Sequence, residues 1–300
     1  MKKKIKTALI SVSDKKNLKP LLNILKKNKI KIISSGGTYK EIKKLKFKCL
    51  EVSEFTNSPE ILEGRVKTLH PKIHAGILNK REKKSHLKDL KDNNFENIDL
   101  VVVNFYPFEE TIKKTSHSKK VIENIDIGGP SMVRAAAKNY NDVIIITDKH
   151  DYPELIEELK RFKGKTCFDF RKRMASKAFG LTAYYDSVVS EWFNRDIGLI
   201  FPERKTFFGK KINKLRYGEN PHQRSSIYIN SLKNNNINLN QLSGKELSYN
   251  NYNDIFAGLD VLFSISKGPA TVIIKHANPC GVSLNKSPLK SFINAQASDP

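Results

Sequence analysis

The sequence predicts an α/β fold in which helices cover both faces of a parallel β-sheet. Over the first 150 residues, short apolar runs alternate with stretches that have helical periodicity. This alternation is typical of parallel sheets with helical connections. A second observation is that polar turns follow the first two apolar runs, at residues 11–15 and 34–38. Ligands bind at such strand ends in open α/β sheets, so the turns favour the same fold.

The individual elements follow from the spacing of the apolar residues. Strands are expected at residues 6–12, 30–34, 49–52, 100–104 and 143–147. Helices are expected at residues 17–28, 39–45, 131–138, 151–161 and 168–194, the last as one long helix or as two. The run at 100–104 is short and apolar, which predicts a strand buried on both of its faces.

The last third of the chain has a weaker pattern. Residues 195–214 show no clear period and are expected to connect two domains. The segments expected beyond them are a loop at 215–224, a strand at 226–229, a polar asparagine-rich stretch at 233–240, a helix at 255–266 and a buried strand at 270–274. The sequence therefore predicts a domain over 1–150, a helical segment with a connection over 151–214, and the opening, incomplete part of a second domain over 215–300.

Composition limits the classes of partner. The formal net charge is +23, but the lysines are spread along the chain and no recognition-helix motif accompanies them. This distribution favours a small anionic substrate over nucleic acid. Three cysteines without paired spacing argue against a disulfide framework or a zinc ribbon and fit a reducing cytosol. No apolar run approaches the length of a membrane helix, so we expect a soluble, cytoplasmic protein without membrane contact.

Two turns have the residue types of an anion site. At 11–15 (SVSDK), two hydroxyls, a lysine and the amides of a following helix can bind one anion, although simple helix capping is an alternative. At 34–38 (SSGGT), paired glycines let the backbone approach an oxyanion, although a tight turn is an alternative. Because both turns follow neighbouring strands, together they favour a phosphate site.

A cationic loop follows at 64–71 (GRVKTLHP). Arg65 can donate two parallel hydrogen bonds, whereas Lys67 is a mobile point charge. His70 and His74 stand four residues apart, but Pro71 lies between them and no glutamate follows as in zinc proteases. We therefore expect no metal here and structural roles for both histidines.

Three further motifs carry polar groups. NFYPF at 104–108 ends an apolar run, which places Asn104 and Tyr106 near the carboxyl edge. IDIGG at 125–129 and RAAAKN at 134–139 place Asp126 at the start of a helix and Lys138 on its later turns. A core position for Tyr106 and a capping role for Asp126 are the structural alternatives.

These motifs resemble a known family. SVSDK, SGGT, GRVKTLHP, NFYPF, IDIGG and RAAAKN have the order and approximate spacing found in the bifunctional purine-biosynthesis proteins. That family joins an aminoimidazole-carboxamide-ribotide (AICAR) transformylase to an inosine-monophosphate (IMP) cyclohydrolase. The resemblance runs from Lys6 to the end of the chain. It implies a methylglyoxal-synthase-like domain that closes formylated AICAR into IMP with loss of water.

The resemblance also implies site residues for the cyclohydrolase step. Those expected to hold the 5′-phosphate and ribose are Ser11, Ser13, Lys15, Ser35, Gly37 and Thr38. Those expected around the base are Arg65, Lys67, Thr68, Asn104, Tyr106, Asp126, Gly128 and Lys138. Ring closure within one molecule depends on positioning, on a stabilised oxyanion and on proton transfer. We expect Lys67 and Tyr106 to stabilise the oxyanion, and Asp126 with Lys138 to move protons.

The last motifs resemble the start of the transformylase domain, which implies a cytidine-deaminase-like fold. They are LRYGENPHQ at 215–223, LSYNNYND at 247–254 and KHANPCG at 275–281. The implied formyl donor is 10-formyltetrahydrofolate. Arg216, Tyr217 and Asn251 are expected to bind the ribotide, and Lys275 and His276 form the implied catalytic pair, with His276 accepting a proton. Family members continue for roughly a further domain's length, so we expect no useful formyl transfer from these 300 residues alone.

Other functions remain compatible with the same fold. Methylglyoxal synthase shares it, so a lyase acting on a small phosphorylated ketone is one alternative. A nucleotide-sensing regulatory domain is another, although it would not need Lys67, Tyr106, Asp126 and Lys138 together. Nucleic-acid binding ranks third. Purine ribotides are the expected ligands, no catalytic metal is expected, and the resemblance implies a homodimer.

Overall fold

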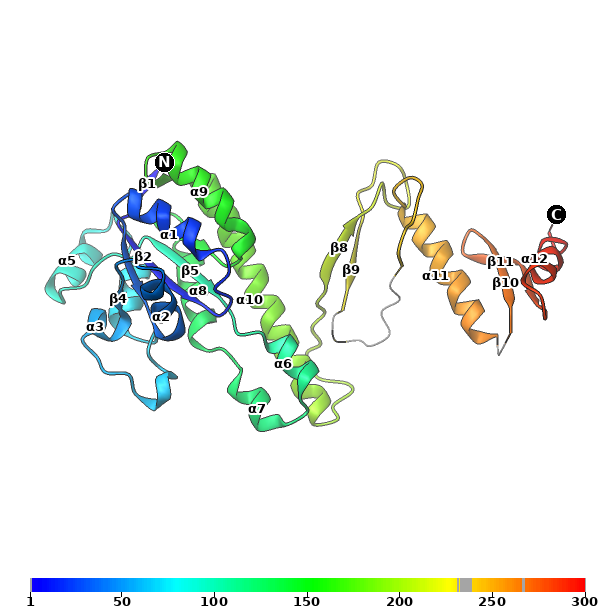
Figure 1. Ribbon diagram of the computed structural model, residues 1–300, viewed down its shortest axis with the longest axis horizontal. Helices are drawn as coiled ribbons and strands as arrows, with labels where there is room; N and C mark the ends of the chain where they lie inside the picture. The colour runs from blue at the N-terminus through cyan, green and yellow to red at the C-terminus, as the bar shows by residue number, and fades with distance from the viewer. Residues whose placement is uncertain (1, 231, 233–238, 266–267, 300) are drawn as a thin grey trace. The chain divides into compact units, whose positions relative to one another are not determined.

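The structure is a computed structural model that describes residues 2–230, 232, 239–265 and 268–299. The chain forms two compact units, Met1–Phe208 and Gly209–Pro300 (Figure 1). The division falls inside the segment 195–214 that was expected to connect two domains. Most of the expected asparagine-rich stretch, at 233–238, lies outside the described residues, as does the final residue of the expected helix at 255–266.

A five-stranded parallel sheet forms the centre of the first unit, which confirms the predicted α/β fold. Its strands are β2 (Thr7–Val12), β3 (Lys31–Ser34), β4 (Leu50–Glu51), β5 (Leu100–Asn104) and β6 (Ile144–Ile146). They lie in the order β4-β3-β2-β5-β6, with every neighbouring pair parallel. A separate antiparallel pair joins β1 (Lys3–Lys4) to β7 (Lys165–Thr166).

The strand order reverses direction at β2. From β2 the chain adds β3 and β4 on one side, then returns to add β5 and β6 on the other. Because crossovers between parallel strands are right-handed, this reversal distributes the connecting helices over both faces of the sheet. It also leaves a crevice between the carboxyl ends of β2 and β5, the usual ligand position in such sheets.

The helices of the first unit cover this sheet. The longer ones are α1 (Leu18–Lys27), α2 (Gly36–Lys44), α4 (Pro71–Leu78), α5 (Lys84–Asp92), α8 (Gly128–Lys138), α9 (Tyr152–Arg161) and α10 (Phe168–Asp196). The shorter ones are α3 (Val52–Thr56), α6 (Phe108–Lys114), α7 (Ser118–Glu123) and the 3-10 turns η1 (Leu62–Gly64) and η2 (Lys149–Asp151). Helix α1 packs against α9, and α8 packs against α4 and α10. The expected helix at 168–194 is one continuous helix of 29 residues.

The expected third strand at 49–52 is shorter than predicted. Only Leu50 and Glu51 pair with β3, opposite Ile33 and Ser34, because β3 itself ends at Ser34. Val52 therefore begins helix α3, and its side chain is buried under the sheet edge at 2% exposure. The apolar residue at 52 was expected to belong to the strand, but it belongs to a helix.

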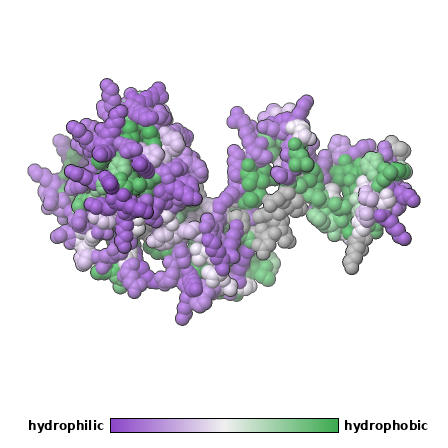
Figure 2. Space-filling view, viewed as in Figure 1, coloured by the Kyte–Doolittle hydropathy of each residue, from purple (hydrophilic) through white to green (hydrophobic). Residues whose placement is uncertain are grey.

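The core of the first unit is continuous. Strand β5 supplies Leu100, Val101, Val102 and Val103, each buried to within 1% of complete, as expected for a central strand. Burying each such side chain stabilises the fold by about 1.5–3 kcal/mol. The outer face of this unit in Figure 2 is largely hydrophilic, so the apolar residues are concentrated inside.

Arg171 of α10 is a charged side chain inside this unit, with 1% of its surface exposed. Its guanidinium donates to the carbonyl oxygens of Tyr140 at 2.8 Å, Thr166 at 2.6 Å and Asn141 at 3.0 Å. Burial lowers the pKa of Arg171, and the nearby Asp142 carboxylate opposes that shift. The side chain thus joins the loop before β6 to the start of α10.

The described residues of the second unit form two antiparallel strand pairs and two helices. The pairs are β8 (Lys210–Lys214) with β9 (Ser226–Ile229) and β10 (Ala270–Lys275) with β11 (Asn278–Leu284), and the helices are α11 (Tyr249–Ser264) and α12 (Pro288–Gln296). Both helices pack against β10. The expectation that residues 270–274 are buried is wrong, because within the described residues β10 pairs only with β11 and its side chains stay partly exposed. Hydrophobic residues cover much of the surface of this unit in Figure 2. Phe263, for example, is 69% exposed.

No helix among the described residues is both long enough and apolar enough to cross a bilayer.

We predict that Arg171→Met lowers the free energy of unfolding of the first unit by about 2–4 kcal/mol. Carbonyl oxygens left without a partner in the interior cost roughly 1–3 kcal/mol each. The measurement is urea unfolding followed by fluorescence of Trp192, the single tryptophan of the chain, which lies on α10. The control is Arg173→Met, which removes an exposed ion pair with Glu154 and should cost at most about 1 kcal/mol. Equal losses in the two variants would contradict the assignment.

Candidate active site

A cavity of about 560 Å³ opens at the crevice between β2 and β5. This volume lies within the range of roughly 300–1,000 Å³ that is common for ligand pockets. The walls come from the ends of β2, β3 and β5, the first turns of α2 and α8, and the loop at 63–68. The expected site residues that line it are Ser11, Ser13, Lys15, Ser35, Gly37, Thr38, Arg65, Lys67, Thr68, Asn104, Tyr106, Asp126 and Gly128. The structure therefore brings together side chains from turns that are as much as 117 residues apart, from Ser11 to Gly128.

One end of the cavity lies at the start of α2, where two lysines come close to the backbone. Helix α2 begins at Gly36, whose φ of 54° favours glycine, and Ser35 before it makes no side-chain cap bond to the helix. A Cβ placed on Gly37 would lie 3.6 Å from the Lys15 ammonium, and one on Gly36 would lie 2.9 Å from the Lys67 ammonium. Two cations thus stand beside the unsatisfied amides of a helix N-terminus, where anions are stabilised.

Thr38 supports this end without offering its hydroxyl to a ligand. Its Oγ1 accepts from the Val12 amide at 3.0 Å and donates to the Val12 carbonyl at 2.9 Å. The residue is buried, so both bonds are shielded from water. Thr38 therefore fixes the first turn of α2 to the end of β2, although it was expected to contact the phosphate or ribose.

Asn104 holds the turn that follows β2. Its Oδ1 accepts from the amides of Ser13 at 2.5 Å and Asp14 at 3.0 Å, and its Nδ2 donates to the Asp14 carbonyl at 3.1 Å. Asp14 points to Lys149, with Oδ2 2.6 Å from Nζ, and this contact lowers the pKa of the Asp14 carboxyl. Asn104 therefore orders the loop that carries Ser13 and Lys15.

Asp126 combines a structural bond with membership of the cavity. Its Oδ1 accepts from the Gly129 amide at 2.8 Å, so the expected role at the start of a helix is confirmed. Its own amide donates to the Tyr185 hydroxyl at 2.8 Å. Burial raises the pKa of Asp126, and hydrogen bonds from the backbone amides of Gly129 and Tyr106 only partly offset this shift. The carboxyl is thus partly dehydrated and lines the cavity wall.

Tyr106 and Thr68 complete the wall near Asp126. Tyr106 is 48% exposed, so the alternative of a core tyrosine is wrong. Thr68 is buried, and a Cβ on Gly128 would lie 2.6 Å from its Oγ1. A glycine at 128 is therefore needed for the loop at 63–68 to approach the first turn of α8.

The cationic loop has an unusual backbone. Leu62, Glu63 and Gly64 have φ of 50°, 53° and 86° in succession, a left-handed turn that costs non-glycine residues roughly 1–2 kcal/mol each. After this turn, Arg65 forms an ion pair with Glu123, and Lys67 Nζ lies 3.3 Å from Glu60 Oε1. Both cations at the cavity mouth therefore already have carboxylate partners.

Lys138 stands outside this cavity. It is exposed on the last turn of α8, ten residues after Gly128, which corresponds to about 15 Å along the helix axis. Because Gly128 is the end of α8 that meets the cavity, the structure does not bring Lys138 together with Asp126. Lys138 therefore does not line this cavity, and its expected part in moving protons stays a prediction.

The histidines have structural surroundings. His70 Nδ1 accepts from the Lys72 amide at 3.1 Å and caps α4, as expected. Burial lowers the pKa of His74, which also bonds to the Thr68 backbone. Within the part of the chain that the structure describes, no group of three histidine, cysteine or acidic side chains could hold a metal ion.

Sequence reasoning missed several residues of the site. Tyr185 comes from α10, a helix in which no motif was found, and it reaches Asp126 only because α10 packs against α8. Glu123 and the apolar residues Ile122 and Ile127 also line the cavity. Ile127 is itself part of the IDIGG motif at 125–129 and Ile122 stands three residues before it, so this motif could have indicated both.

The expected residues of the second unit lie on three segments that meet. The amide of Tyr249 donates to the Tyr217 carbonyl at 3.1 Å, and the amide of Ala277 donates to Asp254 Oδ1 at 2.8 Å. These bonds bring the motifs at 215–223, 247–254 and 275–281 together. The side chain of Asn251 closes a capping box with Ser248 at the start of α11.

The proposed catalytic pair of this unit is exposed. Lys275 Nζ lies 3.0 Å from Asp299 Oδ2, and His276 adopts a left-handed φ of 53° after the end of β10. Arg216 stacks on the Tyr217 ring at 4.9 Å, and its Nη2 lies 3.3 Å from the Tyr217 hydroxyl. The expected ligand-binding groups therefore stand on the surface of the described part of this unit.

Comparison with known proteins agrees with this architecture. Residues 17–131 match the model of the MGS-like domain, which confirms the expected methylglyoxal-synthase-like fold. The crystal structure of ForH is similar at 32% identity with a TM-score of 0.57, over 63% of this chain and 99% of that chain. Two proteins named bifunctional purine biosynthesis protein PurH are also similar. The one from Bradyrhizobium diazoefficiens is 44% identical over 99% of this chain, and the one from Thermoanaerobacter sp. strain X514 is 47% identical over 98%.

The chain spans 57% and 58% of the lengths of these two relatives. Residues 136–300 match the model of the AICARFT/IMPCHase bienzyme, which is more than half of the chain. With five of the six ordered motifs gathered around one cavity and this match over the remainder, the chain belongs to the AICARFT/IMPCHase bienzyme family.

Proposed function

We propose that the cavity of the first unit binds formylated AICAR and closes it to IMP with loss of water. The observation that carries this proposal is a single cavity that joins an anion site at the start of α2 to Lys67, Tyr106 and Asp126. The names of the PurH relatives support purine biosynthesis as the setting. Inosine monophosphate and its precursor both carry the phosphate that such an anion site requires.

Binding would begin at the phosphate. The amides of the first turn of α2, with Lys15 and the Ser35 hydroxyl, offer donors to its oxygens. Asn104 and Thr38 act indirectly, because their polar groups already hold the backbone of the two turns. The base would then extend toward α8, where Thr68, Tyr106 and Asp126 line the wall.

The reaction needs three events that these side chains can assist. The carboxamide nitrogen forms a bond to the formyl carbon, and the electron pair of the formyl C=O moves to oxygen. Lys67 and the Tyr106 hydroxyl would stabilise that oxyanion. The Asp126 carboxylate would accept the proton of the attacking nitrogen, and the oxyanion would take up a proton to become a hydroxyl. The formylamino nitrogen would then lose its proton and form a C=N bond to the former formyl carbon, while a second proton on the hydroxyl lets it leave as water. A carboxyl with a raised pKa suits proton transfer near neutral pH.

A nucleotide-sensing domain would need the two phosphate turns alone. In this cavity, Lys67, Tyr106 and Asp126 stand beside those turns, which favours catalysis over sensing.

For the second unit we propose a contribution to an AICAR transformylase that uses 10-formyltetrahydrofolate as formyl donor. Arg216, Tyr217, Asn251, Lys275 and His276 remain the proposed residues for that step. A homodimer and a cytoplasmic location stay predictions.

We predict that Lys67→Ala lowers kcat for cyclisation by about 100- to 1,000-fold, the usual effect of removing one oxyanion donor. The measurement is an ultraviolet assay of the purified 300-residue chain with formylated AICAR and without folate. The control is Lys114→Ala, because that side chain is 77% exposed on α6, away from the cavity lining. Unchanged turnover by a folded Lys67→Ala variant would refute the role given to Lys67.

We predict that Asp126→Asn lowers cyclisation by about 10²- to 10⁴-fold, because it removes the proton acceptor. The asparagine oxygen can still accept from the Gly129 amide, so the helix start should persist. The same variant tests the raised pKa of Asp126 through stability. A carboxyl whose pKa is higher in the folded state favours folding below its ordinary value of 3.8, and this advantage disappears as pH rises through the raised pKa.

The stability of the parent chain relative to Asp126→Asn should therefore fall as pH rises from below 3.8 toward neutrality. Urea unfolding followed by Trp192 fluorescence at several pH values measures this difference. A difference that grows with pH instead would show that the native state favours the charged carboxylate.

A further inference from the structure

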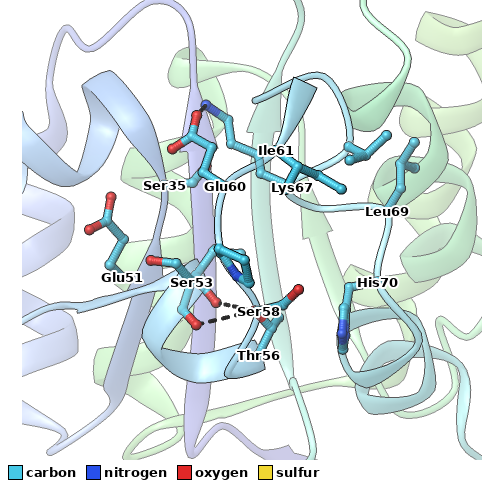
Figure 3. A pocket seen from close by; sticks show the side chains of 13 residues that line it. Ser35, Glu51, Ser53, Thr56, Ser58, Glu60, Ile61, Lys67, Leu69 and His70 are labelled. Atoms are coloured by element: carbon cyan, nitrogen blue, oxygen red, sulfur yellow. Dashed lines mark hydrogen bonds and ion pairs between the residues drawn. The ribbon is translucent and has the colours of Figure 1, made fainter. Parts of the chain in front are cut away.

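The ion pair between Lys67 and Glu60 lies at the border between two spaces. Besides the main cavity, the structure has a smaller pocket of about 150 Å³ between α3 and the loop that carries Lys67 (Figure 3). Lys67 and Ser35 line both spaces, whereas Glu60 lines only the smaller one. Figure 3 shows the Lys67 ammonium turned toward the Glu60 carboxylate, with 3.3 Å between Nζ and Oε1.

The backbone of the loop is shaped so that these two side chains meet. The left-handed turn from Leu62 to Gly64 reverses the chain between Glu60 and Lys67. A Cβ on Gly64 would collide with the Glu60 carboxylate and would lie 3.1 Å from Lys67 Nζ. The glycine therefore leaves room for the pair, and the pair places the ammonium beside Gly36 at the start of α2.

The pair is accessible enough to be exchanged. The side chains are 27% exposed for Lys67 and 45% exposed for Glu60, and partly exposed ion pairs contribute little to stability. An anionic ligand in the main cavity would offer Lys67 a second partner from the opposite side. Because an ammonium carries three donors, Lys67 can turn to that ligand while Glu60 still limits how far it moves.

We propose that Glu60 is a positioning residue for Lys67. The Glu60 carboxylate holds the Lys67 ammonium at the edge of the main cavity and competes with the ligand for that ammonium. This inference rests on the cyclohydrolase function proposed above. It has two consequences of opposite sign. Competition by the carboxylate weakens ligand binding, whereas the fixed position of the ammonium raises kcat, the rate at which the bound substrate reacts.

The test is Glu60→Gln in the 300-residue chain. We expect affinity for IMP, measured by isothermal titration calorimetry, to rise about two- to fivefold, the range of a partly exposed ion pair. We expect kcat with formylated AICAR to fall about tenfold or more, because a misplaced catalytic group loses rate steeply. A variant that merely loosened the loop would weaken IMP binding and lower kcat together. A rise in IMP affinity combined with a fall in kcat therefore identifies positioning.

Three further variants make the test specific. Glu51→Gln removes the same charge from the same small pocket, whereas the ion pair with Lys67 is formed by Glu60, and it should leave both quantities unchanged. In a Lys67→Ala background, Glu60→Gln should have no further effect, because the coupled partner is gone. Glu60→Asp keeps the charge on a shorter side chain and should recover part of the kcat that glutamine loses.

The outcomes separate this inference from the function on which it rests. If the parent chain neither binds IMP nor turns over formylated AICAR, the proposed function itself is wrong. If the parent is active and Glu60→Gln matches either the parent or Glu51→Gln, the positioning role is wrong and the function stands. A full effect of Glu60→Gln in the Lys67→Ala background would also overturn the inference, because Glu60 would then act without Lys67.

Discussion

Val12 and Asn104 are register partners at the carboxyl ends of β2 and β5, and this parallel pairing determines where the cavity groups stand. The Asn104 side chain extends the pairing beyond the strands by holding the amides of Ser13 and Asp14. Thr38 does the same on the other side of β2 through both backbone groups of Val12. The ends of two strands and the start of α2 are thus held in one arrangement by side-chain-to-backbone hydrogen bonds, and the cavity-lining side chains take their positions from it.

The electrostatic design of the cavity follows from that arrangement. Helices α2 and α8 both begin at the cavity, so unsatisfied amides face it from two directions. Lys15, Arg65 and Lys67 add cations, while Glu60 and Glu123 partner two of them. A formal net charge of +23 over the whole chain would in addition attract an anionic substrate from a distance. The carboxylates keep the mobile cations in place until such a substrate arrives.

The sequence was most informative where neighbours along the chain are also neighbours in space. Apolar runs predicted β2, β3, β5 and β6, and the turns that follow β2 and β3 predicted residues that line the cavity, because a strand end fixes the residues next to it. Distances across a helix or between helices were not predictable in this way. Lys138 belongs to the same motif series as Asp126, yet α8 carries it to the far end of the helix.

Tyr185 and Glu60 form contacts that the sequence did not indicate. Tyr185 reaches Asp126 only through the packing of α10 on α8, which leaves no local signature in the sequence. Glu60 meets Lys67 only because three residues between them adopt a left-handed turn, and two of these three are not glycine. The partial exposure of β10, in turn, depends on how many strands pair with it, and the apolar pattern of residues 270–274 does not specify that number.

The cavity residues consequently fall into two physical groups. The side chains of Thr38 and Asn104 form hydrogen bonds with the backbone, so their replacement would act through the geometry of the turns. Lys15, Lys67 and Tyr106 line the cavity with side chains that can donate, so their replacement would act on the ligand itself. Asp126 belongs to both groups, because one oxygen holds Gly129 while the carboxyl remains a partly buried acceptor. For that residue, asparagine separates the two roles, since it preserves the bond to Gly129 and removes only the capacity to take a proton.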